Sequence, residues 1–173
     1  MILFIRDAVM RNFDIYVDSD GVICSFDSHV KNIFGKSVED FVKKSHFWSA
    51  LLYHDTHVEK FFRNLPKMDD ADTLMEYLQT NFNSVKILTA CGTTPSDAAT
   101  QKIEWYAEHY PGIECICVPK SPDKAAYAHS KAILIDDREK SITPWVAAGG
   151  IGVLHTSAAT TIERINNLML EGF

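Results

Sequence analysis

Residues 13–23 are Phe13-Asp14-Ile15-Tyr16-Val17-Asp18-Ser19-Asp20-Gly21-Val22-Ile23, a short apolar segment that runs directly into two aspartates and a glycine. An apolar segment of this kind is typical of a central strand in a parallel sheet, where both faces are covered. The carboxyl ends of such strands are where open α/β folds bind ligands. We therefore expect Asp18 at the strand end and Asp20 nearby, one carboxylate as nucleophile and the other as proton donor. Taken alone, the pattern fits an ordinary strand-to-turn exit equally well, because Asp and Gly are common turn residues.

Two further apolar segments are predicted to be strands that end in groups suited to phosphate or metal chemistry. One ends at the hydroxyl of Thr89, and the other, residues 132–135, ends at the carboxylates of Asp136 and Asp137. Lys124 lies between these two segments and is a candidate for binding phosphate. The ordered set predicts one site more strongly than any of its parts does.

This order of motifs resembles the haloacid-dehalogenase-like phosphohydrolases, and within them the 5'(3')-deoxyribonucleotidase family with its bacterial and phage-type members. The resemblance covers most of the chain from Asp14 to His155. It rests on Asp18-Ser19-Asp20-Gly21-Val22-Ile23 with Phe26, His46-Phe47-Trp48, Phe61-Phe62-Arg63-Asn64-Leu65-Pro66, Ile87-Leu88-Thr89, Asp123-Lys124 and Leu134-Ile135-Asp136-Asp137-Arg138.

Two features depart from the family pattern. Ala90 stands where some members carry a serine that also contacts phosphate. The first thirteen residues match nothing in the family, so either Met1 or Met10 is the start of the chain. If Met1 is the start, we expect the opening residues to add an edge strand.

The resemblance implies a phosphatase mechanism in which Asp18 attacks phosphorus and forms an aspartyl-phosphate. Asp20 would protonate the leaving oxygen and later deprotonate the attacking water. Thr89 would donate its hydroxyl to a phosphate oxygen, and Ala90 beside it would line the substrate site. Lys124 would offset the phosphate charge, and Lys120 is left open as its alternative.

A divalent cation is implied as well, with Mg²⁺ expected because its ligands would be hard oxygens. These would be the Asp18 carboxylate, the Asp20 main-chain carbonyl and a carboxylate from Asp136 or Asp137. Resemblance to the family favours Asp137. Adjacent strand residues point in opposite directions, so the sequence does not decide between the two.

The predicted fold is α/β, a doubly wound parallel sheet with a Rossmann-like core of the haloacid-dehalogenase type. Strands separated by helical segments imply right-handed crossovers. We expect a single domain over residues 1–173, with the core at about 10–34 and 68–173. An aromatic-rich segment at about 35–67 breaks the alternation, and we expect it to form a small helical cap over the carboxyl edge.

Three details of the helices are predicted from local patterns. Asp55 would cap a helical segment over residues 56–63, and Asp69 or Asp70 would cap the helix that follows. A helix over residues 96–109 would place Ile103 and Tyr106 on its buried face.

Aromatic residues in and below the cap are candidates for binding a nucleobase. Phe47 and Trp48 would stack on the base, an interaction worth roughly 1–3 kcal/mol per base, and Phe26 would line the pocket beneath. The alternative is that these side chains simply hold the cap to the sheet.

Composition excludes several classes of function. A net charge of -6 over 173 residues argues against a nucleic-acid polymer as partner, although one mononucleotide is still allowed. No apolar run approaches the roughly 20 residues that span a bilayer, which argues against a membrane protein. Four cysteines without Cys-x-x-Cys spacing predict reduced thiols in a cytoplasmic protein. A homodimer is left open.

The sequence thus predicts a Mg²⁺-dependent phosphomonoesterase acting on a small phosphate ester, with deoxyribonucleoside monophosphates as the expected substrates. Two rivals remain. One is a phosphatase of sugar phosphates or other small esters, and the other is a non-catalytic phosphate-sensing or partner-binding module on the same scaffold.

Overall fold

A computed structural model describes residues 12–170 of the chain. Its centre is one five-stranded parallel sheet with strand order β3-β2-β1-β4-β5. The central strand β1 is covered on both faces, and Ile15 and Val17 are completely buried. The strands are β1 (Asp14–Val17), β2 (Ser84–Ala90), β3 (Glu114–Val118), β4 (Ala132–Asp136) and β5 (Ile151–Leu154).

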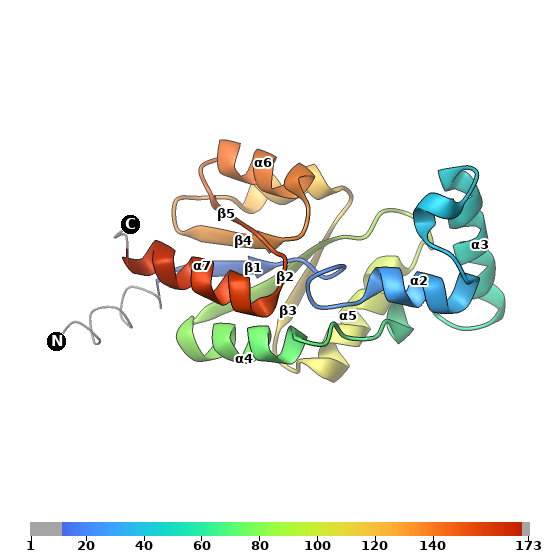
Figure 1. The fold of residues 1–173 in the computed structure, drawn as a ribbon, viewed down its shortest axis with the longest axis horizontal. Helices are drawn as coiled ribbons and strands as arrows, with labels where there is room; N and C mark the ends of the chain where they lie inside the picture. The colour runs from blue at the N-terminus through green and yellow to red at the C-terminus, as the bar shows by residue number, and fades with distance from the viewer. Residues whose placement is uncertain (1–11, 171–173) are drawn as a thin grey trace.

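Helices cover both faces of the sheet (Figure 1). Helices α4 (Ala71–Asn81), α5 (Ala98–His109) and α7 (Ala158–Leu170) pack on one face. Helix α6 (Glu139–Ala147) and the 3-10 helix η3 (Ser121–Tyr127) cover the other. Alternate side chains of each central strand enter the two cores. The prediction of a doubly wound α/β fold is confirmed.

A helical insert follows the first strand and extends from the end of the sheet where α2 and α3 lie in Figure 1. Phe47 packs its ring against Phe26, Phe34 and Phe41, so aromatic contacts join the elements of the cap. The predicted cap and its bounds of 35–67 stay a prediction. The elements of this region are α2 (Phe26–Phe34), η1 (Val38–Asp40), α3 (Lys44–His57) and η2 (Phe62–Asn64).

The predicted cap at Asp55 is wrong in its location. Asp55 lies inside α3, which continues to His57, and the chain from Val58 to Lys60 is not helical. Its buried carboxylate instead accepts the Phe61 N–H at 2.8 Å, immediately before η2. The carboxylate caps the next helical turn across a short loop that local spacing does not reveal.

Asp70 stands at the N-cap position of α4, but its side chain makes no capping bond to that helix. Its carboxylate accepts the N–H of Ala158 at 2.6 Å, at the start of α7. Helices α4 and α7 are neighbours on one face of the sheet, which is why a residue far away in sequence receives the cap.

The predicted buried face of α5 is half wrong. Tyr106 is buried as expected, but the Ile103 side chain is 47 % exposed. The buried stripe instead carries Lys102 and Trp105, three residues apart on the face that includes Tyr106. A charged residue therefore replaces the expected isoleucine against the sheet.

The expected edge strand and the alternative start at Met10 fall within residues 1–11, which lie outside the described part of the chain. Among residues 12–170, no helix is long and apolar enough to cross a bilayer. The four cysteines are unpaired.

Candidate active site

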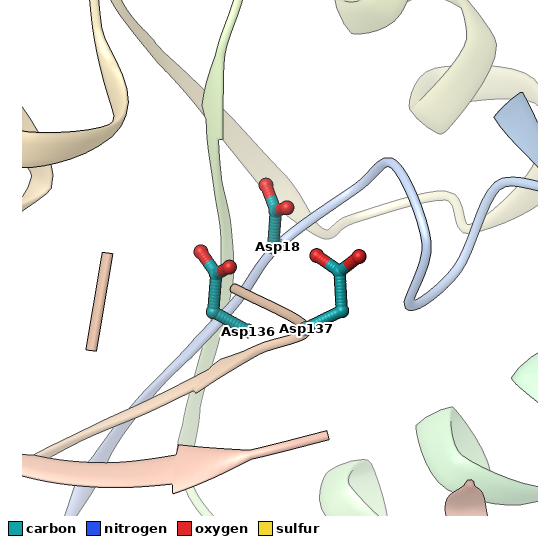
Figure 2. Close-up of side chains that lie close together, drawn as sticks. All are labelled: Asp18, Asp136 and Asp137. Atoms are coloured by element: carbon teal, nitrogen blue, oxygen red, sulfur yellow. The ribbon is translucent and has the colours of Figure 1, made fainter. Parts of the chain in front are cut away.

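The ends of two neighbouring strands, β1 and β4, bring the predicted carboxylates together. Asp18 follows β1, and β4 beside it ends at Asp136, because Val17 is in register with Ile135. The carboxylates of Asp18, Asp136 and Asp137 each offer an oxygen within 4.8 Å of the others. Figure 2 shows the three side chains gathered at the strand ends.

Lys124 bridges two of these carboxylates. Its Nζ lies 2.7 Å from Asp18 Oδ1 and 2.5 Å from Asp136 Oδ2, and the residue is only 1 % exposed. Burial alone would lower the pKa of Lys124, but the two carboxylates raise it above its ordinary value. Lys120, the alternative phosphate lysine, is exposed and lines the outer cavity instead.

A second buried lysine, Lys102, was not predicted from the sequence. Its Nζ donates to Asp20 Oδ2 at 2.7 Å and to Thr89 Oγ1 at 2.9 Å. Burial opposes its charge, yet the carboxylate of Asp20 and other nearby groups raise its pKa, so the ammonium stays charged. The available signal was a lysine three residues before Trp105, a spacing that places both on one helix face.

The two lysines reach the site from opposite faces of the sheet. Leu88 belongs to the core under α6, so its neighbour Thr89 points to the α5 face and meets Lys102. Lys124 arrives from η3 on the face of α6. Each of the paired aspartates, Asp18 and Asp20, therefore has a separate ammonium partner.

Asp136 and Asp137 differ in the partners that they already have. Asp136 accepts the Arg138 N–H at one oxygen and the Lys124 ammonium at the other. Asp137 Oδ1 is buried and has no hydrogen-bond partner within residues 12–170. Burial and the Asp18 charge raise the pKa of Asp137 to about 6. An unpartnered carboxylate oxygen beside Asp18 fits a hard divalent cation such as Mg²⁺.

The loop that follows Asp18 is held by several hydrogen bonds and by one close approach. The Ser19 carbonyl accepts the N–H groups of Val22, Ile23 and Cys24, and Tyr106 OH donates to Ser19 Oγ at 3.0 Å. Gly21 has φ +88, and a Cβ there would lie 2.8 Å from Asp137 Cγ. Only glycine satisfies both the backbone angle and the close approach.

A cavity of about 720 Å³ opens between the cap and the sheet and reaches Asp20. Phe26, Phe47, Trp48 and Ala90 all line it, as does Phe62, which the sequence analysis did not select. Phe47 is almost completely buried among other rings, whereas Trp48 is half-buried. Phe47 therefore packs within the cap, and the stacking of Phe47 and Trp48 on a base stays a prediction.

Comparison with known proteins identifies the family. The family model for "5' nucleotidase, deoxy (Pyrimidine), cytosolic type C protein" matches residues 11–167. The chain belongs to this family. This deoxynucleotidase-type chain is accordingly a haloacid-dehalogenase-like hydrolase of the phosphatase class. No curated protein matched its sequence.

Solved structures share the fold of this nucleotidase-family chain at low sequence identity. A hydrolase from Streptococcus pneumoniae TIGR4 is 13% identical with a TM-score of 0.53, covering 90% of this chain and 99% of its own. A haloacid-dehalogenase family hydrolase from Deinococcus radiodurans R1, solved with bound phosphate and sodium, is 13% identical with a TM-score of 0.51 and 88% coverage of both chains. The L-2-haloacid dehalogenase from Xanthobacter autotrophicus is 13% identical with a TM-score of 0.51, covering 92% of this chain and 83% of its own. Because this set includes a dehalogenase, the shared fold does not by itself define the reaction.

Proposed function

We propose that the protein is a Mg²⁺-dependent phosphomonoesterase that hydrolyses nucleoside monophosphates, deoxyribonucleotides in particular, through an aspartyl-phosphate on Asp18. The observation that carries the proposal is the pairing of Asp18 with Lys124 and of Asp20 with Lys102 beside the unpartnered oxygen of Asp137. Family membership supports the substrate class. We place the reaction in the cytoplasm, in keeping with four unpaired cysteines.

In this mechanism Asp18 attacks phosphorus while the leaving oxygen takes a proton from Asp20. Lys124 holds the Asp18 carboxylate in place through Oδ1, so that the other oxygen is available for attack. Lys102 and Thr89 form one hydrogen-bonded pair beside Asp20 and contribute charge and a hydroxyl to the phosphoryl oxygens. Asp20 then accepts a proton from the water that hydrolyses the aspartyl-phosphate.

Asp18, the main-chain carbonyl of Asp20 and Asp137 are the groups that would hold Mg²⁺, which supplies charge neutralisation for the transferring phosphoryl group. Asp137 is preferred over Asp136, since both oxygens of Asp136 are engaged by Lys124 and by the Arg138 N–H. Phosphate and sodium bound to the Deinococcus radiodurans relative are in keeping with a phosphate and cation site on this scaffold.

The cavity wall supports a nucleoside as the leaving group. Trp48 is half-buried and offers aromatic surface in a cavity that also borders Asp20. Aromatic side chains stack on bases without strong base preference. A sugar phosphate would leave this surface unused.

The test is released phosphate from a panel of deoxyribonucleoside and ribonucleoside monophosphates, a sugar phosphate and an aryl phosphate, with Mg²⁺ and after chelation. We expect nucleotides to be preferred, chelation to stop turnover, and Asp18→Asn to lower kcat by several orders of magnitude. Lys86→Gln, which removes an exposed ion pair with Glu114, is the matched control. Asp18→Asn with near-normal turnover, or a sugar phosphate as the best substrate, would contradict the proposal.

A further inference from the structure

Four cationic side chains line the outer part of the cavity between cap and core. Lys44 comes from the start of α3, Lys120 from the loop before η3, and Arg138 and Lys140 from the start of α6. We call these four residues the cation rim. The chain as a whole carries 17 basic and 23 acidic residues, so a gathering of positive charge at one cavity runs against its average composition.

The members of the cation rim have almost no ion-pair partners. Within residues 12–170, Lys44, Lys120 and Lys140 form no ion pair, and Arg138 has only a long contact of 3.9 Å with Asp137. Burial, followed by the positive charges of Arg138 and Lys44, lowers the pKa of Lys140. Charges from the cap and from the core therefore face one another closely enough to repel.

Three acidic residues line the same cavity as the cation rim. Asp20 is paired with Lys102, while Asp27 and Glu39 form no ion pair with the rim within residues 12–170. Asp136 and Asp137 partly offset Lys140, but Asp136 is engaged by Lys124 and Asp137 is the proposed cation ligand. A cation bound at Asp137 would weaken the part of that offset that comes from Asp137.

We propose that Lys44, Arg138 and Lys140 form a second anion subsite, and that the cavity takes a phosphate ester carrying a second phosphate group. This inference rests on the proposed function and changes its substrate class from a nucleoside monophosphate to a nucleoside bisphosphate. One phosphate lies at Asp18, the base lies along Trp48, and the other phosphate is held by Lys44, Arg138 and Lys140. The cavity volume of about 720 Å³ falls in the usual range for pockets that bind small molecules.

The experiment compares kcat/KM for a nucleoside 3',5'-bisphosphate and for the 5'-monophosphate of the same nucleoside, in the full chain with Mg²⁺. We expect the bisphosphate to be preferred by about 10-fold or more at low salt, and the preference to shrink as ionic strength rises. In the double variant Lys44→Gln/Lys140→Gln the ratio falls to about one. Lys43→Gln is the control, because it removes one positive charge next to Lys44 but outside the cavity. The ratio of the two kcat/KM values should be retained in this variant.

Two results would overturn the anion subsite: a ratio near one in the unaltered protein, or a preference that survives in the double variant. The failure of the proposed function has a different signature, in which an aryl phosphate is hydrolysed but no nucleotide is. In that case kcat/KM is compared for a sugar bisphosphate and the corresponding sugar monophosphate. A preference for the sugar bisphosphate that is lost in the double variant supports the subsite, and equal kcat/KM values for the two sugar phosphates overturn it. Unchanged melting temperatures verify that the exposed substitutions leave folding intact.

Discussion

Replacing Lys102 with methionine separates the proposed catalytic contribution of this residue from its structural one. Lys102 is only 1 % exposed, and its ammonium contacts Asp20 Oδ2 at 2.7 Å and Thr89 Oγ1 at 2.9 Å. Methionine keeps a long flexible stem in the same space while it removes the charge and both hydrogen bonds. The change therefore tests the ammonium and not the packing.

The structure sets the size of each effect. Loss of one partner from a buried ion pair costs about 3–5 kcal/mol when the remaining charge is sealed from water. The Asp20 side chain is 20 % exposed and can be rehydrated, so we expect a loss of about 1–3 kcal/mol in the free energy of unfolding. Removal of a preorganised charged donor from the reacting phosphate lowers kcat by about 10²–10³-fold.

The assay measures kcat with an aryl phosphate and with a nucleoside monophosphate, together with urea unfolding. Lys86→Met is the control, because it removes an exposed ion pair with Glu114 and is expected to cost less than about 1 kcal/mol without affecting turnover. If Lys102→Met is destabilised but retains kcat within about 2-fold, Lys102 supports the fold alone and the proposed role at the phosphate is wrong.

Three further outcomes follow from the site and its supports. Trp48→Ala should raise KM for nucleoside monophosphates by about 10-fold and leave an aryl phosphate almost unchanged, whereas equal losses on both substrates with a lower melting temperature would assign Trp48 to packing. Gly21→Ala should lower the free energy of unfolding by about 1–3 kcal/mol and remove most of the activity, because the new Cβ would meet Asp137. Gly35→Ala is the control, since Gly35 is also at positive φ but has open space around it and should show the backbone cost alone. Similar activity in the two variants would refute the close-approach argument. Burial lowers the pKa of His155, although the charge of Asp70 opposes this shift. Below about pH 6.5 the unfolded chain therefore binds a proton at His155 more readily than the folded protein does. The stability of the fold should fall as the pH drops through the folded pKa of His155. Urea unfolding from pH 7 to pH 5 should show this loss reduced in His155→Gln, and an identical pH dependence in the variant would exclude His155 as its source.

The strand ends show what periodicity alone can predict. Apolar segments before Asp18, Thr89 and Asp136 indicate parallel strands, and parallel strands place their carboxyl ends at one edge, so these groups had to meet once the strands paired. The resemblance to a known family then assigned a catalytic role to each of these residues. Their placement together is a geometric fact, and their catalytic roles remain predictions that the proposed substitutions test.

The helix partners show where sequence reasoning ends. Asp55 and Asp70 look like caps of the helices next to them, yet their carboxylates bind the N–H groups of Phe61 and Ala158. A capping carboxylate needs only an unsatisfied N–H within reach, and packing determines which N–H that is.

The sequence by itself determined the α/β class, the parallel strands and the set of acidic residues at the site, because strand periodicity and turn chemistry are local properties. Tertiary structure alone decided that Lys102 faces Asp20, that Lys124 reaches Asp18 in place of Lys120, and that Asp137 keeps an unpartnered oxygen. It also brought Lys44 of the cap to the same cavity as Lys140 of the core. A lysine's partner depends on which face of the sheet its helix covers and on the charges that meet it there, and both are set by the crossovers and packing of the whole chain.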